Sequence, residues 1–350
     1  MLETDRNSPD AVAEPPTSSP PPAFAPDPVL VRGREGRWRL PWAILGTVFA
    51  VALLYVLAIP AIQMERLALS RHWLSGAISF ESLLDPKQPY TFLDSALSFA
   101  PFMLAPMLTL VLVHGVSWRR AFSYGSGFDW RAYWKAALAW LIALCASTAL
   151  IFLLEPQQFK LQQHGGDYAV WFMAGLVVIF VQSLAEEVLF KGYLLRVWGA
   201  VFPLRLPVSA VLIALFVSGH LLNTDLRADL WFNLIYFVLI EVLSFVVFFR
   251  TQNLGAAAGM HWSNNVFAFQ LLATVPGQPT AMPLAVYNDP IVAAGGSHLL
   301  DPQAHAVALV MLALAAALLL HPRSPLYLPP QPPVVTEKAT AAEADSGKGA

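Results

Sequence analysis

The sequence predicts an all-α integral membrane protein, a bundle of about eight transmembrane helices around a polar cavity inside the membrane. Of the 350 residues, 57% are hydrophobic and only 13% are charged. Soluble domains average about 45–50% apolar and about 25% charged residues. The mean hydropathy of the chain is +0.56. These values predict that most of the chain lies in the lipid bilayer, which would be its main partner.

Eight apolar windows are long enough to cross a membrane, since a transmembrane helix needs about 20 mostly apolar residues. The windows are 41–63, 93–115, 133–154, 169–195, 206–222, 230–249, 253–275 and 303–321. The fifth window is the shortest. The fourth window is long and ends in charged residues. Together they predict one membrane domain over residues 41–321.

The two ends of the chain differ from this middle part. Residues 1–40 hold eight of the 28 prolines, and residues 322–350 hold six. Segments with so little apolar surface cannot offset the entropy lost on ordering. Both ends are therefore predicted to be disordered tails.

The distribution of positive charge predicts how the helices are oriented. With eight spans and a cytoplasmic N-terminus, 13 Lys and Arg residues flank the spans on the cytoplasmic side and five lie in the outer loops. Short cytoplasmic loops are enriched in Lys and Arg, so this bias predicts that both termini are cytoplasmic. The Ala/Leu/Pro-rich composition favours a bacterial protein, and therefore the inner membrane.

Charge and cysteine content exclude some classes of partner and site. The formal net charge of −2 predicts no nucleic-acid partner. The lone Cys145 excludes an intrachain disulfide and a cysteine-based zinc cluster.

Several polar side chains lie within the apolar windows, where an ionisable group costs about 2.5–3.5 kcal/mol on insertion scales. They are Glu186, Glu187, Lys191, His220, Glu241, His261 and Asn265. Counting residues from Arg196, Arg205 and Arg250 as markers of the cytoplasmic surface gives a depth for each, at a rise of about 1.5 Å per residue. The depths are about 15 Å for Glu186, about 16 Å for His261, and about 22 Å for His220 and Asn265. These four side chains are therefore predicted to share one layer near mid-membrane.

The two adjacent glutamates have different predicted roles. Glu187 and Lys191 are four residues apart with the glutamate first, the order that favours an ion pair on a helix. Lys191 could then extend toward the cytoplasm, and Glu241 is a further partner for it. Glu186 is rotated by about 100° from Glu187 around the helix, so it can face another neighbour.

Two more pairs share a helix face. His261 and Asn265 are four residues apart in "HWSNN", and Phe216 and His220 have the same spacing in "FVSGH". Phe216 is predicted to pack beside His220.

These residue types suit peptide hydrolysis inside a membrane. A buried carboxylate such as Glu186 is a suitable general base, and His220 can help to hold the water. His261 and the Asn265 amide can donate hydrogen bonds to the oxyanion of a tetrahedral intermediate. No serine in a G-x-S-x-G context and no cysteine motif offers a covalent nucleophile.

The ordered triplet "EEVLFKG", "FVSGH" and "HWSNN" resembles the E-E-x-x-x-R, F-x-x-x-H and H-x-x-x-N motifs of the CPBP family. This family comprises intramembrane glutamic endopeptidases related to CAAX prenyl proteases and to Abi-type bacteriocin-processing and self-immunity proteins. The resemblance covers residues 169–275, the predicted catalytic core. It implies Glu186 as the water-activating base assisted by His220, and His261 with Asn265 as the oxyanion hole. Glu187 would support the first motif.

The resemblance leaves some alternatives open. Lys191 stands where the family has arginine, which keeps the charge but loses the bidentate fork. Glu186, His220 and His261 would also satisfy a catalytic zinc site with water as the fourth ligand, although the family's better-studied members favour a mechanism without a metal cofactor.

Three classes of function follow from these residues. The first is an endopeptidase that acts on a peptide or membrane-protein substrate. The second is a transporter or proton-coupled carrier in which the buried Glu and His form a relay. The third is a catalytically inactive membrane scaffold of the same family, for which Lys191 is the clue.

Overall fold

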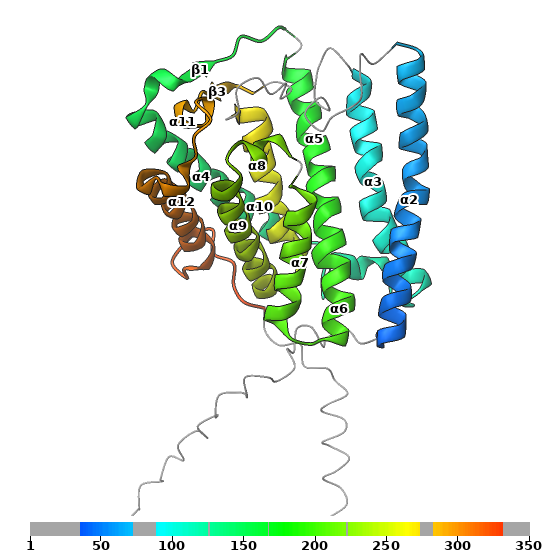
Figure 1. Cartoon of the computed structure of the whole chain (residues 1–350). Coiled ribbons are helices and arrows are strands. Elements are labelled where there is room, and N and C mark those ends of the chain that lie inside the picture. Colours follow the sequence, from blue (N-terminus) through cyan, green and yellow to red (C-terminus); the bar gives the residue numbers. More distant parts are fainter. Residues whose placement is uncertain are drawn as a thin grey trace, which may run out of the picture.

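The protein is a bundle of long helices with a small sheet at one end (Figure 1). The computed structural model describes residues 36–72, 89–124, 127–166, 168–221, 223–273 and 283–331. The predicted tails fall largely outside these residues. The long helices are α2 (Leu40–Ser70), α3 (Pro89–Leu112), α4 (Trp130–Leu154), α5 (Tyr168–Glu187), α7 (Arg205–Gly219), α9 (Leu230–Thr251), α10 (Leu254–Val266) and α12 (Pro302–Leu320).

Short elements connect or extend these helices. They are η2 (Trp118–Ala121), η3 (Pro156–Gln158), η4 (Val188–Leu194), α6 (Leu195–Val201), α8 (Thr224–Ala228), η5 (Phe267–Leu271), α11 (Pro290–Ala293) and η6 (His298–Leu300). Both η4 and η5 are π-helical. The strands are β1 (Phe159–Leu161), β2 (Leu272–Ala273) and β3 (Ala285–Tyr287). Strand β3 is central, antiparallel to β1 and parallel to β2.

The prediction of an all-α, multi-pass membrane protein is confirmed, but the count of eight spans is not. Among the described residues, five helices are long and apolar enough to cross a bilayer. They are Leu40–Ser70, Trp130–Leu154, Tyr168–Val201, Leu230–Thr251 and Pro302–Leu320. Leu97–Leu112 and Arg205–Gly219 are apolar but shorter. Helix α10 spans 13 residues before it continues as the π-helical η5.

Helix α10 lies inside the bundle, packed against α4, α5 and α9 (Figure 1). Its buried residues are mostly small, so neighbouring backbones come close. A Cβ on Gly255 would meet the carbonyl oxygen of Asp129, and one on Gly259 would meet that of Tyr133. The α4–α10 contact therefore depends on these two glycines.

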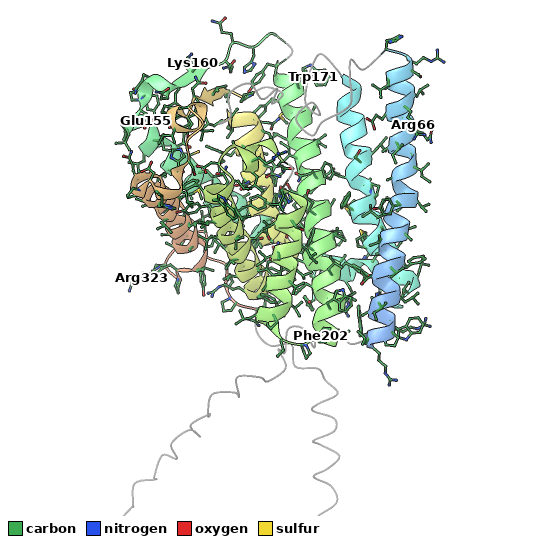
Figure 2. The ribbon with its side chains drawn as sticks, viewed as in Figure 1. Arg66, Glu155, Lys160, Trp171, Phe202 and Arg323 are labelled. Atoms are coloured by element: carbon green, nitrogen blue, oxygen red, sulfur yellow. The ribbon has the colours of Figure 1, made fainter. Side chains whose placement is uncertain are left out.

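The ends of the bundle separate the charged residues into two groups (Figure 2). Arg66 and Lys160 lie in the upper part of this view, and Arg323 and Phe202 lie in the lower part. Arg196, expected to mark the exposed surface, is buried instead. Its guanidinium donates to the carbonyl oxygens of Arg120 and Ser123, which accounts for its burial.

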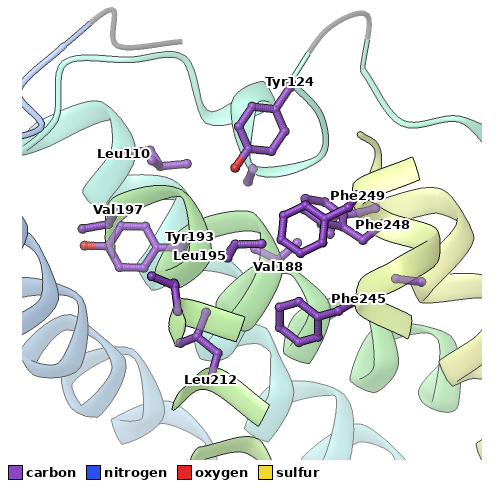
Figure 3. Packing of buried hydrophobic residues seen from close by; sticks show 14 of the residues in the cluster. Leu110, Tyr124, Val188, Tyr193, Leu195, Val197, Leu212, Phe245, Phe248 and Phe249 are labelled. Atoms are coloured by element: carbon purple, nitrogen blue, oxygen red, sulfur yellow. The ribbon is translucent and has the colours of Figure 1, made fainter. Parts of the chain in front are cut away.

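A buried aromatic and aliphatic cluster supports the lower half of the long α5–η4–α6 helix (Figure 3). Val188, Tyr193 and Leu195 from this helix pack in the same cluster as Phe245 and Phe248 from α9. The segment that follows the two glutamates therefore shares one buried cluster with side chains of α9.

Residues 322–331, predicted to belong to the disordered C-terminal tail, pack on the bundle. Leu328 is buried, and its carbonyl oxygen accepts a hydrogen bond from the Arg250 guanidinium. Lys135 donates to the carbonyl oxygen of Tyr327 at 3.1 Å. These contacts supply the stabilisation that composition alone did not indicate.

Loops at the sheet end are joined by a histidine between acidic groups. His298 Nε2 lies 2.7 Å from Asp289 Oδ2, and its Nδ1 lies 3.3 Å from Asp301 Oδ2. The Asp229 carboxylate accepts from the His298 backbone N–H at 2.6 Å. Burial lowers the pKa of His298, but Asp289, followed by Asp301 and Asp229, raises it to a value above the ordinary one. A cavity of about 310 Å³ lies beside this cluster.

We predict that replacing Gly259 with alanine lowers the free energy of unfolding by about 1–3 kcal/mol, because the added methyl group overpacks the α4–α10 contact. Thermal unfolding of the purified protein in detergent measures the effect. Gly166→Ala is the control, since nothing lies within 4 Å of a Cβ at that position. Equal unfolding temperatures for both variants would show that the contact is not tight.

We predict that His298 stabilises the fold more at low pH than at high pH. Its pKa is higher in the folded state than the value of about 6.5 in the unfolded chain. The contribution is therefore complete below about pH 6.5 and is lost as the pH rises through the raised pKa. The difference in unfolding temperature between wild type and His298→Gln should shrink from pH 5 to pH 9. The exposed His321→Gln is the control, and a constant difference for His298→Gln would contradict the prediction.

Candidate active site

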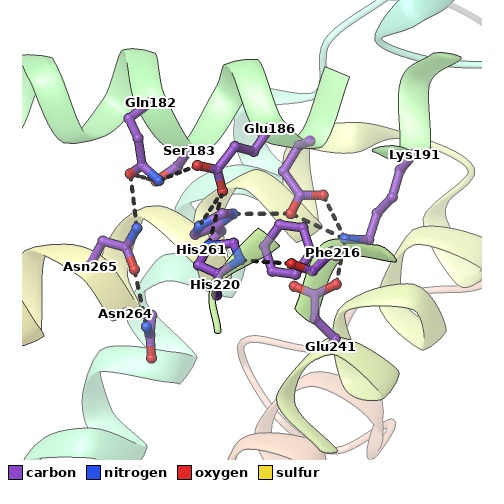
Figure 4. Close-up of polar contacts among 11 residues, drawn as sticks. Gln182, Ser183, Glu186, Lys191, Phe216, His220, Glu241, His261, Asn264 and Asn265 are labelled. Carbon is purple, nitrogen blue, oxygen red and sulfur yellow. Dashed lines mark hydrogen bonds and ion pairs between the residues drawn. The ribbon is translucent and has the colours of Figure 1, made fainter. Parts of the chain in front are cut away.

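The polar residues predicted near mid-membrane come from five elements and meet at one place (Figure 4). Helix α5 carries Glu186 and Glu187 at its C-terminal end, and η4 continues directly with Lys191. His220 follows the last residue of α7, and His261 lies on α10. Helix α9 contributes Glu241.

Lys191 is held between two buried carboxylates. Its Nζ lies 2.9 Å from Glu187 Oε2 and 3.0 Å from Glu241 Oε2. The ammonium group also lies 4.6 Å from the centre of the Phe245 ring. The expected ion pair with Glu187 therefore forms, but the expected extension of Lys191 toward the cytoplasm is wrong. The side chain is 1% exposed, because the second carboxylate and the ring replace water around the charge.

His261 bridges the two adjacent glutamates. Its Nδ1 lies 3.2 Å from Glu187 Oε1, and its Nε2 lies 3.5 Å from Glu186 Oε2. A carboxylate can only accept, so Nδ1 carries a hydrogen directed at Glu187. Glu187 thus sets the orientation of the His261 ring as well as pairing with Lys191.

The fifth window predicted His220 within a helix. In the structure, His220 lies at the end of α7 instead. The helix ends at Gly219, and His220 is its C-cap residue. Its Nδ1 donates to the carbonyl oxygen of Phe216 at 2.8 Å, which leaves Nε2 facing Glu186 Oε2 at 3.9 Å. Phe216 packs beside it as predicted, with ring centroids 4.5 Å apart.

The sequence reasoning missed Gln182, which links Glu186 to Asn265. Gln182 Nε2 donates to Glu186 Oε1 at 2.7 Å, and Gln182 Oε1 accepts from Asn265 Nδ2 at 2.9 Å. Asn265 thus joins the cluster through Gln182. Gln182 could have been identified from its four-residue spacing to Glu186, which places both side chains on one helix face.

The two carboxylate oxygens of Glu186 differ in their hydrogen-bond partners. Oε1 accepts from Gln182, whereas Oε2 is buried and accepts no hydrogen bond from the described residues. Oε2 faces the Nε2 atoms of both His220 and His261. A buried carboxylate oxygen between two imidazoles can accept a proton from a molecule that enters the cavity.

A cavity of about 400 Å³ contains this cluster. Its polar lining residues include Gln182, Glu186, His220, Glu241, His261, Asn264 and Asn265. Its other lining residues are largely apolar and aromatic and come from several helices: Phe99, Phe102, Leu189, Phe190, Phe216, Phe237, Met260 and Phe269. The cavity therefore combines a polar centre with apolar walls, as expected of a site for an apolar substrate.

The arrangement of possible metal ligands bears on the zinc alternative. Within the described part of the chain, no group of three or more His, Cys, Asp or Glu side chains is arranged to hold a metal ion. The zinc alternative through Glu186, His220 and His261 stays a prediction that the chelator experiment below tests.

Comparison with known proteins gives a match over the same region. Residues 168–267 match the family described as "Type II CAAX prenyl endopeptidase Rce1-like". The uncharacterized protein YyaK of Bacillus subtilis (strain 168) is 22% identical over 205 residues, which cover 55% of this chain and 68% of YyaK. No solved structure matches. The resemblance expected from the three motifs is thus confirmed.

We predict that Lys191→Met lowers the free energy of unfolding by about 3–5 kcal/mol, because Glu187 and Glu241 lose the charge between them. Lys191→Arg keeps that charge, so its free energy of unfolding should fall by less. Thermal unfolding in detergent measures both, with Lys135→Met as the control for removal of a lysine that donates to a backbone carbonyl. If Lys191→Met unfolds at the same temperature as Lys135→Met, the ion pairs do not stabilise the fold.

Proposed function

We propose that the chain is an intramembrane endopeptidase of the Rce1-like family of type II CAAX prenyl endopeptidases, which its residues 168–267 match, and that it hydrolyses a peptide bond with a water molecule activated by Glu186. The observation that carries the proposal is the buried Glu186 Oε2, which has no hydrogen-bond donor among the described residues and faces both His220 and His261.

The proposed roles follow from which atoms can donate. His220 Nδ1 donates to the Phe216 carbonyl, so Nε2 of the neutral ring is an acceptor. Glu186 Oε2 is an acceptor too. A water molecule that donates one hydrogen to each would direct an oxygen lone pair away from both, toward a substrate carbonyl carbon.

The reaction then proceeds without a covalent enzyme intermediate. Glu186 takes a proton as the water oxygen bonds to the carbonyl carbon, which forms a tetrahedral oxyanion. When the C–N bond breaks, Glu186 returns the proton to the leaving amine. The products are a new carboxylate and a new amine, and Glu186 is restored as a base.

His261 and Asn265 are proposed to stabilise the oxyanion. One Asn265 Nδ2 hydrogen is directed at Gln182 Oε1, and the second remains for the oxyanion. His261 donates from Nδ1 to Glu187, and a ring held between two carboxylates can also carry a proton on Nε2. Such preorganised donors typically contribute a factor of about 10²–10³ to the rate.

The family match favours a peptidase over a transporter or proton-coupled carrier, in which the same residues would relay protons. The inactive-scaffold alternative rests on lysine in place of the motif arginine. Lys191 makes close contacts with both Glu187 and Glu241, so the substitution does not leave either carboxylate without its cation. We therefore propose that Lys191 is compatible with an active enzyme.

The apolar walls of the cavity favour an apolar peptide or a segment of a membrane protein as substrate. We further propose an orientation in a bacterial inner membrane with both termini in the cytoplasm. In that orientation the end of the bundle that bears Arg323 faces the cytoplasm (Figure 2).

We predict that Glu186→Gln and His220→Ala each lower peptide cleavage at least about 100-fold, since general acid–base catalysis typically contributes about 10²–10⁴-fold. Purified wild type and variants would be compared on a peptide library, each with and without chelator. Glu155→Gln is the control, because this carboxylate lies in another cluster, against Tyr287. The wild-type rate should survive the chelator.

Two results would contradict this account. Cleavage by Glu186→Gln at the wild-type rate would exclude Glu186 as the base. Loss of wild-type activity on chelation, with recovery on addition of zinc, would exclude the metal-free mechanism.

A further inference from the structure

Three carboxamides and an indole form a continuous chain of hydrogen bonds that ends on Glu186. Trp140 Nε1 donates to Asn264 Oδ1 at 3.2 Å, and Asn264 Nδ2 donates to Asn265 Oδ1 at 3.1 Å. Asn265 Nδ2 donates to Gln182 Oε1 at 2.9 Å, and Gln182 Nε2 donates to Glu186 Oε1 at 2.7 Å. Figure 4 shows the three amides in sequence between α10 and α5. The chain thus joins α4, α10 and α5.

The two ends of this chain determine its direction. An indole N–H can only donate, and an ionised carboxylate can only accept. Reversing any one of the three amides would place two donors or two acceptors face to face. Each amide therefore has one orientation that satisfies the whole chain, and Trp140 sets it from a position that is fully buried.

This direction has two consequences for the active site. Gln182 occupies Glu186 Oε1, which leaves Oε2 as the oxygen that faces the histidines. Asn265 must present its NH₂ group, not its carbonyl oxygen, toward Gln182 and the cavity. An oxyanion requires a donor at that position.

We propose that Trp140, Asn264 and Gln182 are positioning residues, a directional hydrogen-bond relay that orients the base Glu186 and the donor Asn265 for hydrolysis. This inference rests on the proposed function. It adds three residues that are not among the defined positions of the E-E-x-x-x-R, F-x-x-x-H and H-x-x-x-N motifs; Asn264 occupies a variable position of the third.

Asn264→Asp tests the direction of the relay. The variant keeps an acceptor for Trp140 but replaces the donor toward Asn265 with a carboxylate oxygen. We expect kcat to fall about tenfold or more, with KM within about twofold of wild type, because the changed group orients the reacting groups rather than binding substrate. Because partial unfolding would also lower the apparent kcat at unchanged KM, kcat is expressed per folded molecule, as determined from the unfolding curve of each variant.

Trp140→Phe tests the remote end of the relay, since Trp140 is not among the residues that line the cavity. We expect kcat to fall about fivefold, the effect of losing one hydrogen bond. Trp262→Phe is the matched control: its indole donates to the backbone carbonyl of Leu176 at 3.1 Å, outside the relay. The control should keep the wild-type kcat.

A spectroscopic measurement tests the relay independently of hydrolysis. In full-length protein labelled with ¹⁵N-tryptophan, the indole cross peak of Trp140 is identified by its loss in Trp140→Phe. We expect this peak to move in Asn264→Asp and also in Gln182→Ala, because hydrogen bonds in a chain polarise one another. Asn264 and Asn265 lie between the indole and Gln182, so a shift of the Trp140 peak in Gln182→Ala reports the whole relay.

The outcomes separate the two proposals. A Trp140 peak that is unchanged in both variants overturns the relay. Wild-type kcat in Asn264→Asp and Trp140→Phe, with cleavage that still requires Glu186, overturns its positioning role and leaves the proposed function intact. Absence of any cleavage that depends on Glu186 overturns the proposed function, while the peak shifts still decide whether the relay exists.

Discussion

The buried ammonium group of Lys191 is the interaction on which the rest of the site depends. It lies about equally close to Glu187 and Glu241, and so ties η4 and the end of α5 to α9. Glu187 in turn holds His261 on α10. Removing a single partner from such a buried set leaves an uncompensated charge, which is energetically costly. We therefore expect α5, η4, α9 and α10 to keep their relative positions.

Around this charge cluster, the packing of small residues brings the remaining parts into range. Gly259 lets α10 approach α4, and His261 follows two residues later on α10. The same approach places Asn264 against the Trp140 indole. The positions of the histidine and the amides are thus consequences of close backbone packing, and the catalytic proposal depends on both the charge cluster and the helix contact.

The sequence predicted the membrane bundle, the shared layer of polar residues and the ion pair of Glu187 with Lys191. Those predictions rest on composition, on rise per residue and on four-residue spacing, which are properties of a single helix. Gln182, Asn264 and Trp140 could not be identified in this way, because their importance arises from contacts between helices. The burial of Lys191 and Arg196 was missed for the same reason: depth along one helix does not reveal which groups face it from others.

The central claim is that Glu186 and His220 hold one reactive water molecule, next to His261. An experimental density map of the full-length protein, at a resolution that shows ordered water, tests it most directly. The account predicts a water molecule within about 3 Å of Glu186 Oε2 and of His220 Nε2, a typical hydrogen-bond distance. A metal ion bound by these three side chains at about 2.0–2.2 Å, or Glu186 directed away from the histidines, would contradict it.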